Sequence, residues 1–174
     1  MCDTAVGPLL VVASKGKLVS IKFNIDEKRT PEALDELERE LRGGFTLERD
    51  DRALQPIVRH LQAYLDGRRK DLDIPFDVSW IAGFRREVLL EVSRVPRGAV
   101  ATYGEIARRC RRPNAYRAVG NTMRTNPIPL VIPCHRIIGS SGSLHGFGGG
   151  LGMKEQLLNL EAATGWVNPQ AASL

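Results

Sequence analysis

Prolines and glycines in the last third of the chain restrict its fold more than any other sequence feature. Pro127, Pro129 and Pro133 lie close together. Each proline removes a backbone N–H donor and biases the residue before it to extended geometry, so the segment around them cannot be helical. Ser140 to Gly150 is rich in glycine and is predicted to be a loop. The sequence therefore predicts a long irregular segment between helices, with Cys134 inside it.

The first 80 residues have the pattern of a small α/β domain. Val6 to Val12 and Leu18 to Ile25 are rich in aliphatic residues, and the turn at Ser14-Lys15-Gly16 predicts a hairpin. One helix is predicted to start at Thr30-Pro31 and another to cover Ala53 to Leu65, because apolar residues recur there at spacings of three and four. An irregular stretch follows, and we place a domain boundary at its end.

The remainder of the chain is predicted to be mostly helical. A helix is expected over Gly83 to Arg94. Thr102 to Glu105 has the form of a capping box, in which each of the two side chains accepts from the other residue's backbone N–H. This box would begin a short helix at 103–110, and further helices are expected over Ala115 to Arg124 and Lys154 to Ala163.

Helices 103–110 and 115–124 are separated by a four-residue turn, which gives them helix-turn-helix proportions. Two short helices with a turn also occur as ordinary packing elements, so this motif alone is weak evidence. The predicted fold class is α+β, with an α/β domain over 1–80 and a mostly helical domain over 81–174 that contains the helix-turn-helix.

The positive charge of the chain is concentrated around these two helices. The net charge is +5, and residues 83–124 contain ten arginines against three glutamates, whereas residues 1–82 and 125–174 carry net charges of −2 and zero. A basic segment of this kind favours a polyanion, and nucleic acid is the commonest one. A solvated, arginine-rich surface is the alternative that charge alone leaves open.

Several other classes of protein lack support in the sequence. No apolar run approaches the roughly 18 residues that a membrane span needs, and the start of the chain lacks the pattern of a secretory signal. The three cysteines are odd in number and widely spaced, which argues against a disulfide framework and a zinc site. We therefore expect a monomeric cytoplasmic protein (nuclear, if its source is eukaryotic) without a metal or cofactor.

Cys134 carries the clearest chemical signal, because it lies between Pro133 and His135. A thiol attacks carbon well only as the thiolate, and its ordinary pKa is about 8.5, so a base must remove its proton. His135 is the candidate base, directly or through a water, with a carboxylate to orient it. Buried cysteine is more often inert core filling. The rigid turn before Cys134, the glycine loop after it and the basic helices favour a nucleophile.

The segment Ile132 to Ile138 resembles the active-site stretch of the O6-alkylguanine-DNA alkyltransferases (methylated-DNA–protein-cysteine methyltransferases). The resemblance extends from about residue 80 to 163, because further motifs follow the family's order and spacing. They are Tyr103 to Ala107, Arg117 to Gly120, Met123 to Pro127, and Gly150-Leu151 with Lys154-Glu155. The first 80 residues resemble the family's ribonuclease-H-like domain only in their strand–helix outline.

The resemblance implies repair of double-stranded DNA by direct reversal. The protein would bind the minor groove, flip the damaged base out, and transfer the alkyl group of O6-alkylguanine, or of O4-alkylthymine, to Cys134. Nothing in the sequence supplies a water nucleophile or second thiol to break the resulting thioether. Each molecule is therefore expected to act once.

The resemblance also implies roles for five residues beside the acceptor. His135 would be the base, acting through a bridging water, and Glu161 on the last helix would hold its imidazole. Asn126 would brace the turn that carries the cysteine. Tyr103 would push on the target phosphate and donate a hydrogen bond to the base, and Lys154 would stabilise the leaving guanine anion.

Substrate binding is implied for the glycine loop and its neighbours. The N–H of Gly148 would bind O6, and the carbonyl groups of Cys134 and Ile137 would accept from the guanine amino group. Phe147 and Gly148 stand where some relatives have tyrosine and serine, which puts tolerance of bulky alkyl groups in doubt. Arg117 would fill the space left by the flipped base. The DNA-binding residues implied are Thr102, Arg117, Ala118, Gly120 and Arg124.

Three rival functions remain to be weighed. A non-catalytic binder of alkylguanine lesions would resemble the second half but lack the acceptor cysteine, which is present here. A cysteine hydrolase would need a base and an orienting group placed separately, which adjacent residues seldom provide. A plain helix-turn-helix regulator would make Cys134 incidental.

Overall fold

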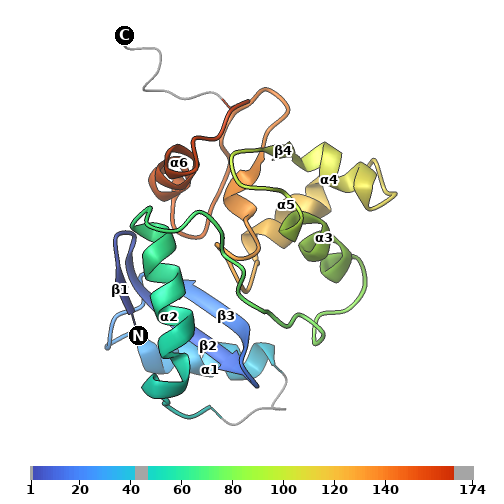
Figure 1. Cartoon of the computed structure of the whole chain (residues 1–174). Coiled ribbons are helices and arrows are strands. Elements are labelled where there is room, and N and C mark those ends of the chain that lie inside the picture. Colours follow the sequence, from blue (N-terminus) through green and yellow to red (C-terminus); the bar gives the residue numbers. More distant parts are fainter. Residues whose placement is uncertain (1, 42–46, 167–174) are drawn as a thin grey trace. The chain divides into compact units, whose positions relative to one another are not determined.

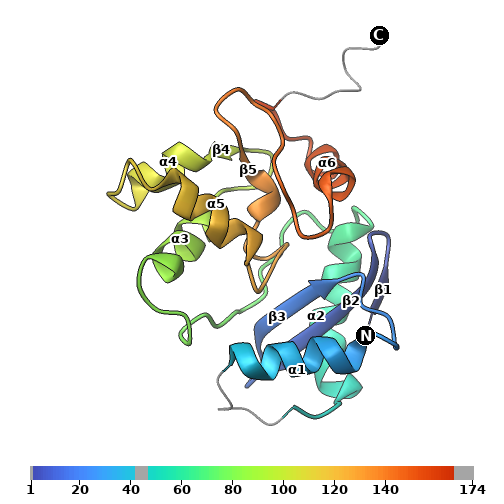
Figure 2. The ribbon, with the colours of Figure 1, turned by 180° about the vertical axis from the view of Figure 1, so that it is seen from behind.

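The computed structural model describes residues 2–41 and 47–166 of the 174-residue chain. The chain divides into two compact units, Met1–Trp80 and Ile81–Leu174. Figures 1 and 2 show the elements of both units from two sides.

The first unit is built on an antiparallel sheet of β1 (Cys2–Thr4), β2 (Gly7–Ser14) and β3 (Lys17–Phe23), in that order. The two residues between β2 and β3, Lys15 and Gly16, both have positive φ, at 50° and 76°. Two-residue turns with φ above zero match the right-handed twist of a hairpin. This turn accounts for the hairpin expected from the sequence.

Two helices, α1 (Thr30–Glu40) and α2 (Asp51–Leu65), cover opposite faces of this sheet (Figures 1 and 2). Because both faces are covered, Leu9–Val11 of β2 are buried in succession instead of alternating. Helix α2 begins two residues earlier than predicted, since the Asp50 side chain accepts a 2.9 Å hydrogen bond from the N–H of Ala53 and caps the helix.

The second unit is mostly helical, as expected. Helices α3, α4 and α5 pack against one another, and a short parallel pairing joins β4 to β5. Its elements are α3 (Gly83–Ser93), β4 (Ala101–Thr102), α4 (Tyr103–Arg109), α5 (Tyr116–Arg124), the 3-10 turn η1 (Cys134–Arg136), β5 (Ile137–Ile138) and α6 (Leu151–Leu160).

The predicted capping box begins α4. Thr102 Oγ1 accepts from the N–H of Glu105 at 3.1 Å, and the Glu105 carboxylate accepts from the Thr102 N–H at 2.6 Å. Thr102 also pairs with Ile138 in the β4–β5 ladder. The cap and the ladder together fix Tyr103, the first residue of α4, beside the segment that carries Cys134.

The last helix lies three residues earlier than predicted. Helix α6 starts at Leu151, directly after Gly150 with φ of 87°, and ends at Leu160. Glu161 is therefore the C-cap and not a helical residue, which corrects the expectation of a helix over 154–163. A Schellman-type ending follows, with Ala162 in the left-handed region at φ of 51°.

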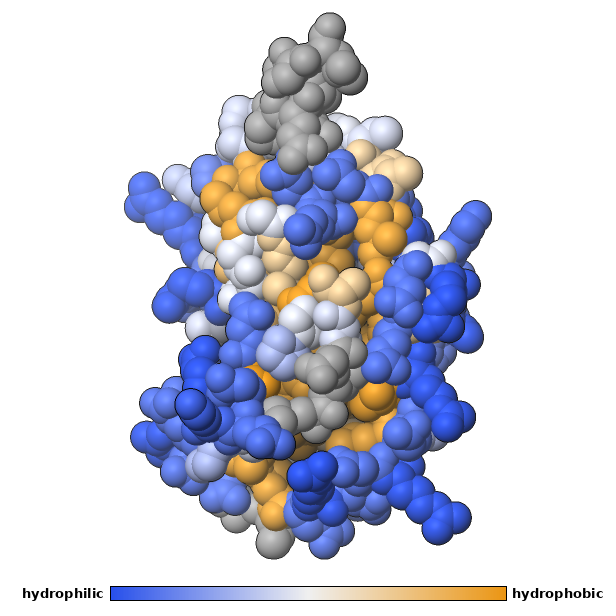
Figure 3. All heavy atoms as spheres, turned by 90° about the vertical axis from the view of Figure 1, so that its left-hand side faces the viewer, coloured by the Kyte–Doolittle hydropathy of each residue, from blue (hydrophilic) through white to orange (hydrophobic). Residues whose placement is uncertain are grey.

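The first unit, a sheet with a helix on each face, and the helical second unit confirm the α+β class. In the part of the chain that the structure describes, no helix combines the length and the apolar character needed to cross a membrane. On the face drawn in Figure 3, hydrophilic side chains surround apolar patches.

Candidate active site

The turn before Cys134 is fixed by a side-chain amide. Asn126 Nδ2 donates to the carbonyl oxygen of Ile132 at 2.8 Å, and Asn126 Oδ1 accepts from the N–H of Ile128 at 3.1 Å. The same Ile132 carbonyl accepts from the Cys134 N–H at 2.8 Å. Leu130, buried within this turn, has a φ of 74°, a conformation that costs free energy in a residue with a side chain. Asn126 thus lies where it can hold η1 in place.

The Cys134 side chain is almost inaccessible, since the residue is 4% exposed. Burial raises the pKa of its thiol, although a hydrogen bond from Asn126 and the charge of Lys154 act in the opposite direction. The resting sulfur is therefore a thiol at neutral pH. A nucleophilic role for this group requires a base that removes its proton.

The neighbouring imidazole has the geometry of such a base. His135 Nε2 lies 2.8 Å from Glu161 Oε1, and both side chains are fully buried. A carboxylate accepts only, so the hydrogen is assigned to Nε2 and the lone pair to Nδ1. His135 Nδ1 is buried and has no hydrogen-bond partner among the described residues. Burial lowers the pKa of His135, against the effect of Glu161, and the ring is neutral at pH 7.

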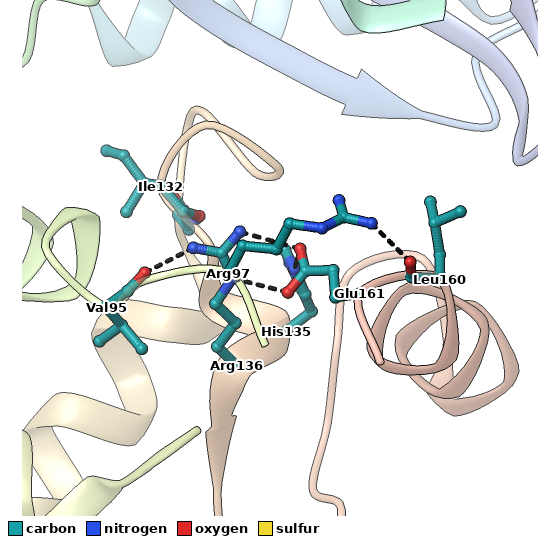
Figure 4. Close-up of polar contacts among 8 residues, drawn as sticks. Val95, Arg97, Ile132, His135, Arg136, Leu160 and Glu161 are labelled. Carbon is teal, nitrogen blue, oxygen red and sulfur yellow. Dashed lines mark hydrogen bonds and ion pairs between the residues drawn. The ribbon is translucent and has the colours of Figure 1, made fainter. Parts of the chain in front are cut away.

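Arg136 completes this cluster and was not anticipated from the sequence. Its Nε donates to Glu161 Oε2 at 2.8 Å, its Nη2 donates to Glu161 Oε1 at 2.9 Å, and its Nη1 donates to the Val95 carbonyl (Figure 4). Burial alone would raise the pKa of Glu161, but hydrogen bonds from His135 and Arg136 hold it well below its usual range. A buried carboxylate needs a cation. That rule could have pointed to Arg136, because Lys154 is the one other basic residue after Arg124.

Lys154 is the second buried cation of the site, with no exposed surface. Its Nζ donates to the carbonyl oxygen of Ile137 at 2.6 Å and to that of His145 at 3.1 Å. Burial lowers the pKa of Lys154 to about 8, although an ionised Cys134 would raise it. Lys154 therefore connects β5 to the glycine loop within electrostatic range of the sulfur. The Ile137 carbonyl, expected to accept from guanine, already has one donor.

Aromatic rings surround the same region. The rings of Tyr103 and His145 lie 6.2 Å apart, and the Phe147 ring stands edge-on to His135 at 6.4 Å. Burial raises the pKa of Tyr103, and the Cys134 charge adds to this effect. A Cβ added to Gly120 would meet the Tyr103 ring at 3.9 Å. Helix α5 therefore packs beside Tyr103 at Gly120, with room for a Cβ at that position.

The residues expected to contact DNA are mostly exposed. Arg117, Ala118 and Arg124 lie on the exposed side of α5, and the Arg117 guanidinium rests 5.7 Å above the Tyr116 ring. Gly148 in the loop is exposed as well. Thr102 differs from these residues, because its hydroxyl donates to Glu105 at 2.9 Å and is committed to the capping box.

The chain is similar to a family of known proteins along most of its length. Residues 83–163 match the 6-O-methylguanine DNA methyltransferase DNA-binding domain, and residues 1–78 match the ribonuclease-like domain of the same enzymes. A methylated-DNA–protein-cysteine methyltransferase of Mycolicibacterium paratuberculosis is 37% identical over 159 residues, which cover 91% of this chain and 88% of the relative. The chain belongs to the 6-O-methylguanine DNA methyltransferase family.

Further members of this family match most of the chain and share its fold. The inducible methylated-DNA–protein-cysteine methyltransferase of Bacillus subtilis is 35% identical, with 88% of this chain and 78% of the relative covered. The crystal structure of Mycobacterium tuberculosis OGT in complex with DNA superposes with a TM-score of 0.74 at 33% identity, covering 92% of this chain and 89% of that one. Cys134, His135 and Glu161 all fall within the matched DNA-binding domain.

Proposed function

We propose that this protein repairs alkylated guanine in double-stranded DNA by taking the alkyl group onto Cys134, once per molecule. The observation that supports this best is the buried pair of Glu161 and His135 on the residue next to Cys134. Glu161 fixes the imidazole of His135 through Nε2, and the Nδ1 lone pair remains available on the residue next to Cys134. Membership of the methyltransferase family supplies the reaction class.

The reaction balances with these groups alone. The Cys134 thiol gives its proton to His135, directly or through one water, and the sulfur attacks the alkyl carbon. The S–C bond forms as the bond between carbon and O6 breaks, and guanine leaves as an anion. The proton that His135 accepted passes to guanine N1 through water, which restores the neutral imidazole. The backbone N–H of Gly148 and the charge of Lys154 stabilise the negative charge as it develops. The thioether that remains has no attacking group to reverse it.

Access to the base requires flipping, which costs a few kcal/mol. Arg117 is suited to offset this cost, since its guanidinium is exposed on α5 and can enter the stack. Tyr103 is the first residue of α4 and its ring lies beside Gly120 of α5; its role would be to hold the flipped nucleotide. The small side chains at Ala118 and Gly120 would let α5 enter the minor groove without a steric clash. Arg124 would pair with a phosphate.

The two units have separate roles in this proposal. Residues 81–174 bind DNA and accept the alkyl group, whereas residues 1–80 support them. A reducing compartment suits the acceptor, because Cys110 and Cys134 are both free thiols. We therefore place the protein in the cytoplasm, or in the nucleus of a eukaryote.

The variant Cys134→Ala tests the proposal. It is expected to lose transfer from an O6-methylguanine duplex while it still binds that duplex in a gel-shift assay, because the DNA-contacting residues lie on α5. Cys110→Ala is the matched control and should transfer at the wild-type rate. Transfer that survives Cys134→Ala would contradict the assignment. A wild type that binds the lesion without becoming alkylated would instead indicate a lesion-binding protein.

A further inference from the structure

We propose that Arg136 is a positioning residue for the alkyl-transfer reaction, which holds Glu161 against His135 and limits how strongly Glu161 draws a proton onto the imidazole. The inference rests on the proposed function, since it concerns how the proposed base keeps its lone pair. It adds a residue that touches neither the sulfur nor the substrate.

The geometry shows how one carboxylate serves two donors. Glu161 Oε1 accepts from both His135 Nε2 and Arg136 Nη2, while Oε2 accepts from Arg136 Nε at 2.8 Å. The forked contact fixes the plane of the carboxylate, because both oxygens are held by one rigid guanidinium. The third nitrogen of Arg136 donates to the Val95 carbonyl, which anchors the guanidinium in turn (Figure 4).

The charges around the imidazole explain why this cation matters. Glu161 attracts a proton to His135, whereas Arg136 and Lys154 repel one, and burial disfavours the charged ring. Without Arg136, no cation would balance the buried carboxylate of Glu161 beside the imidazole. The negative charge of Glu161 would then favour the protonated form of His135. An imidazolium has no lone pair and cannot accept the thiol proton. Arg136 therefore keeps His135 in the form that the reaction needs.

The pH dependence of the reaction with free O6-benzylguanine distinguishes this role from a structural one. Wild type is measured first, and a benzyl adduct on Cys134 establishes that the proposed function holds before any variant is compared. For Arg136→Gln we expect the acidic limb of the rate profile to move up by about one pH unit or more. On the acidic limb itself, the rate at a given pH should fall about tenfold for each unit of displacement and recover at higher pH, since one pKa unit is a tenfold change in the neutral fraction there.

Two further variants make the result decisive. Arg136→Lys keeps a charge on one oxygen only, so its acidic limb should move in the same direction by less. Arg94→Gln removes an exposed arginine that pairs with Glu91. This variant should leave the acidic limb of the rate profile where it is in wild type. If Arg136→Gln does not fold, an unmoved limb in Arg136→Lys overturns the proposal. So does an equal loss of rate at every pH in both Arg136 variants, because that pattern reflects structure alone.

NMR titration of the His135 ring gives a readout that does not depend on the rate. In the folded Arg136 variants the imidazole should bind a proton at higher pH than in wild type. An unchanged titration of His135 in a folded Arg136→Gln protein would contradict the inference even if the reaction were slow.

Discussion

Lys154 Nζ lies 2.6 Å from the carbonyl oxygen of Ile137, and the Lys154 side chain is completely buried. It also donates to the His145 carbonyl, so a single ammonium joins β5 to the glycine loop. The glycines of this loop contribute no side chains that could anchor it. Lys154 is therefore expected to order the loop as well as to supply positive charge to the reaction.

Replacement of Lys154 by methionine should affect both properties. We expect the rate of transfer from free O6-benzylguanine to fall about 100-fold, the size of effect seen when one group that stabilises developing charge is removed. Hydrogen exchange of residues 139–150 should become faster. Lys28→Met, at an exposed position, is the control. Unchanged exchange in the loop of Lys154→Met would show that the two carbonyl contacts do not order it.

Glu161→Gln tests the buried ion pair through stability. Removing one partner leaves Arg136 buried without its counter-charge, so the free energy of unfolding should fall by about 3 to 5 kcal/mol at pH 7. Glu91→Gln breaks the more exposed pair with Arg94 and should cost less than about 1 kcal/mol. Urea denaturation measures both variants.

The pH dependence of the same variant has a definite sign. The pKa of Glu161 is lower in the folded protein than its ordinary value of 4.5, so its contribution is complete above that value and is lost as the pH falls below it. Wild type should therefore lose stability below pH 4.5 more steeply than Glu161→Gln. Parallel curves for the two proteins would show that the ion pair contributes nothing to acid stability.

Ala162 offers a substitution that should stabilise the protein. It follows the C-cap Glu161 with φ of 51°, a conformation that suits glycine better than alanine. Ala162→Gly should raise the free energy of unfolding by about 0.5 to 1 kcal/mol. Ala163→Gly, at a position without positive φ, should lower it. Thermal denaturation should show a higher melting temperature for Ala162→Gly and a lower one for Ala163→Gly. A lower melting temperature for both variants would refute this account of the helix end.

Local features of this chain could be predicted from its sequence, whereas contacts between distant residues could not. The capping box at Thr102–Glu105 and the hairpin turn at Lys15-Gly16 are local patterns, because each is formed by residues a few positions apart. The ion pair between Arg136 and Glu161 joins residues 25 positions apart and depends on burial that periodicity does not reveal. The start of α6 was misplaced for a similar reason, since Gly150 reads as loop but its positive φ leads directly into the helix.

Arg117→Ala separates base flipping from chemistry. Repair of O6-methylguanine in duplex DNA should slow by at least about tenfold. Base flipping costs a few kcal/mol, and without the Arg117 side chain nothing in the stack offsets that cost. Reaction with free O6-benzylguanine requires no flipping and should keep its rate. Arg52→Ala, an exposed arginine of α2, is the control for charge. Equal losses on both substrates would argue against a role for Arg117 in the stack.

The most direct test of the whole account is the mass of the intact protein after incubation with excess duplex DNA that contains O6-methylguanine. We expect every molecule to gain one methyl group, with peptide mapping locating it on Cys134, and no further DNA to be repaired afterwards. Methyl groups removed in excess of protein molecules, a methyl group on Cys110 instead, or no gain in mass would each contradict single-turnover transfer to Cys134.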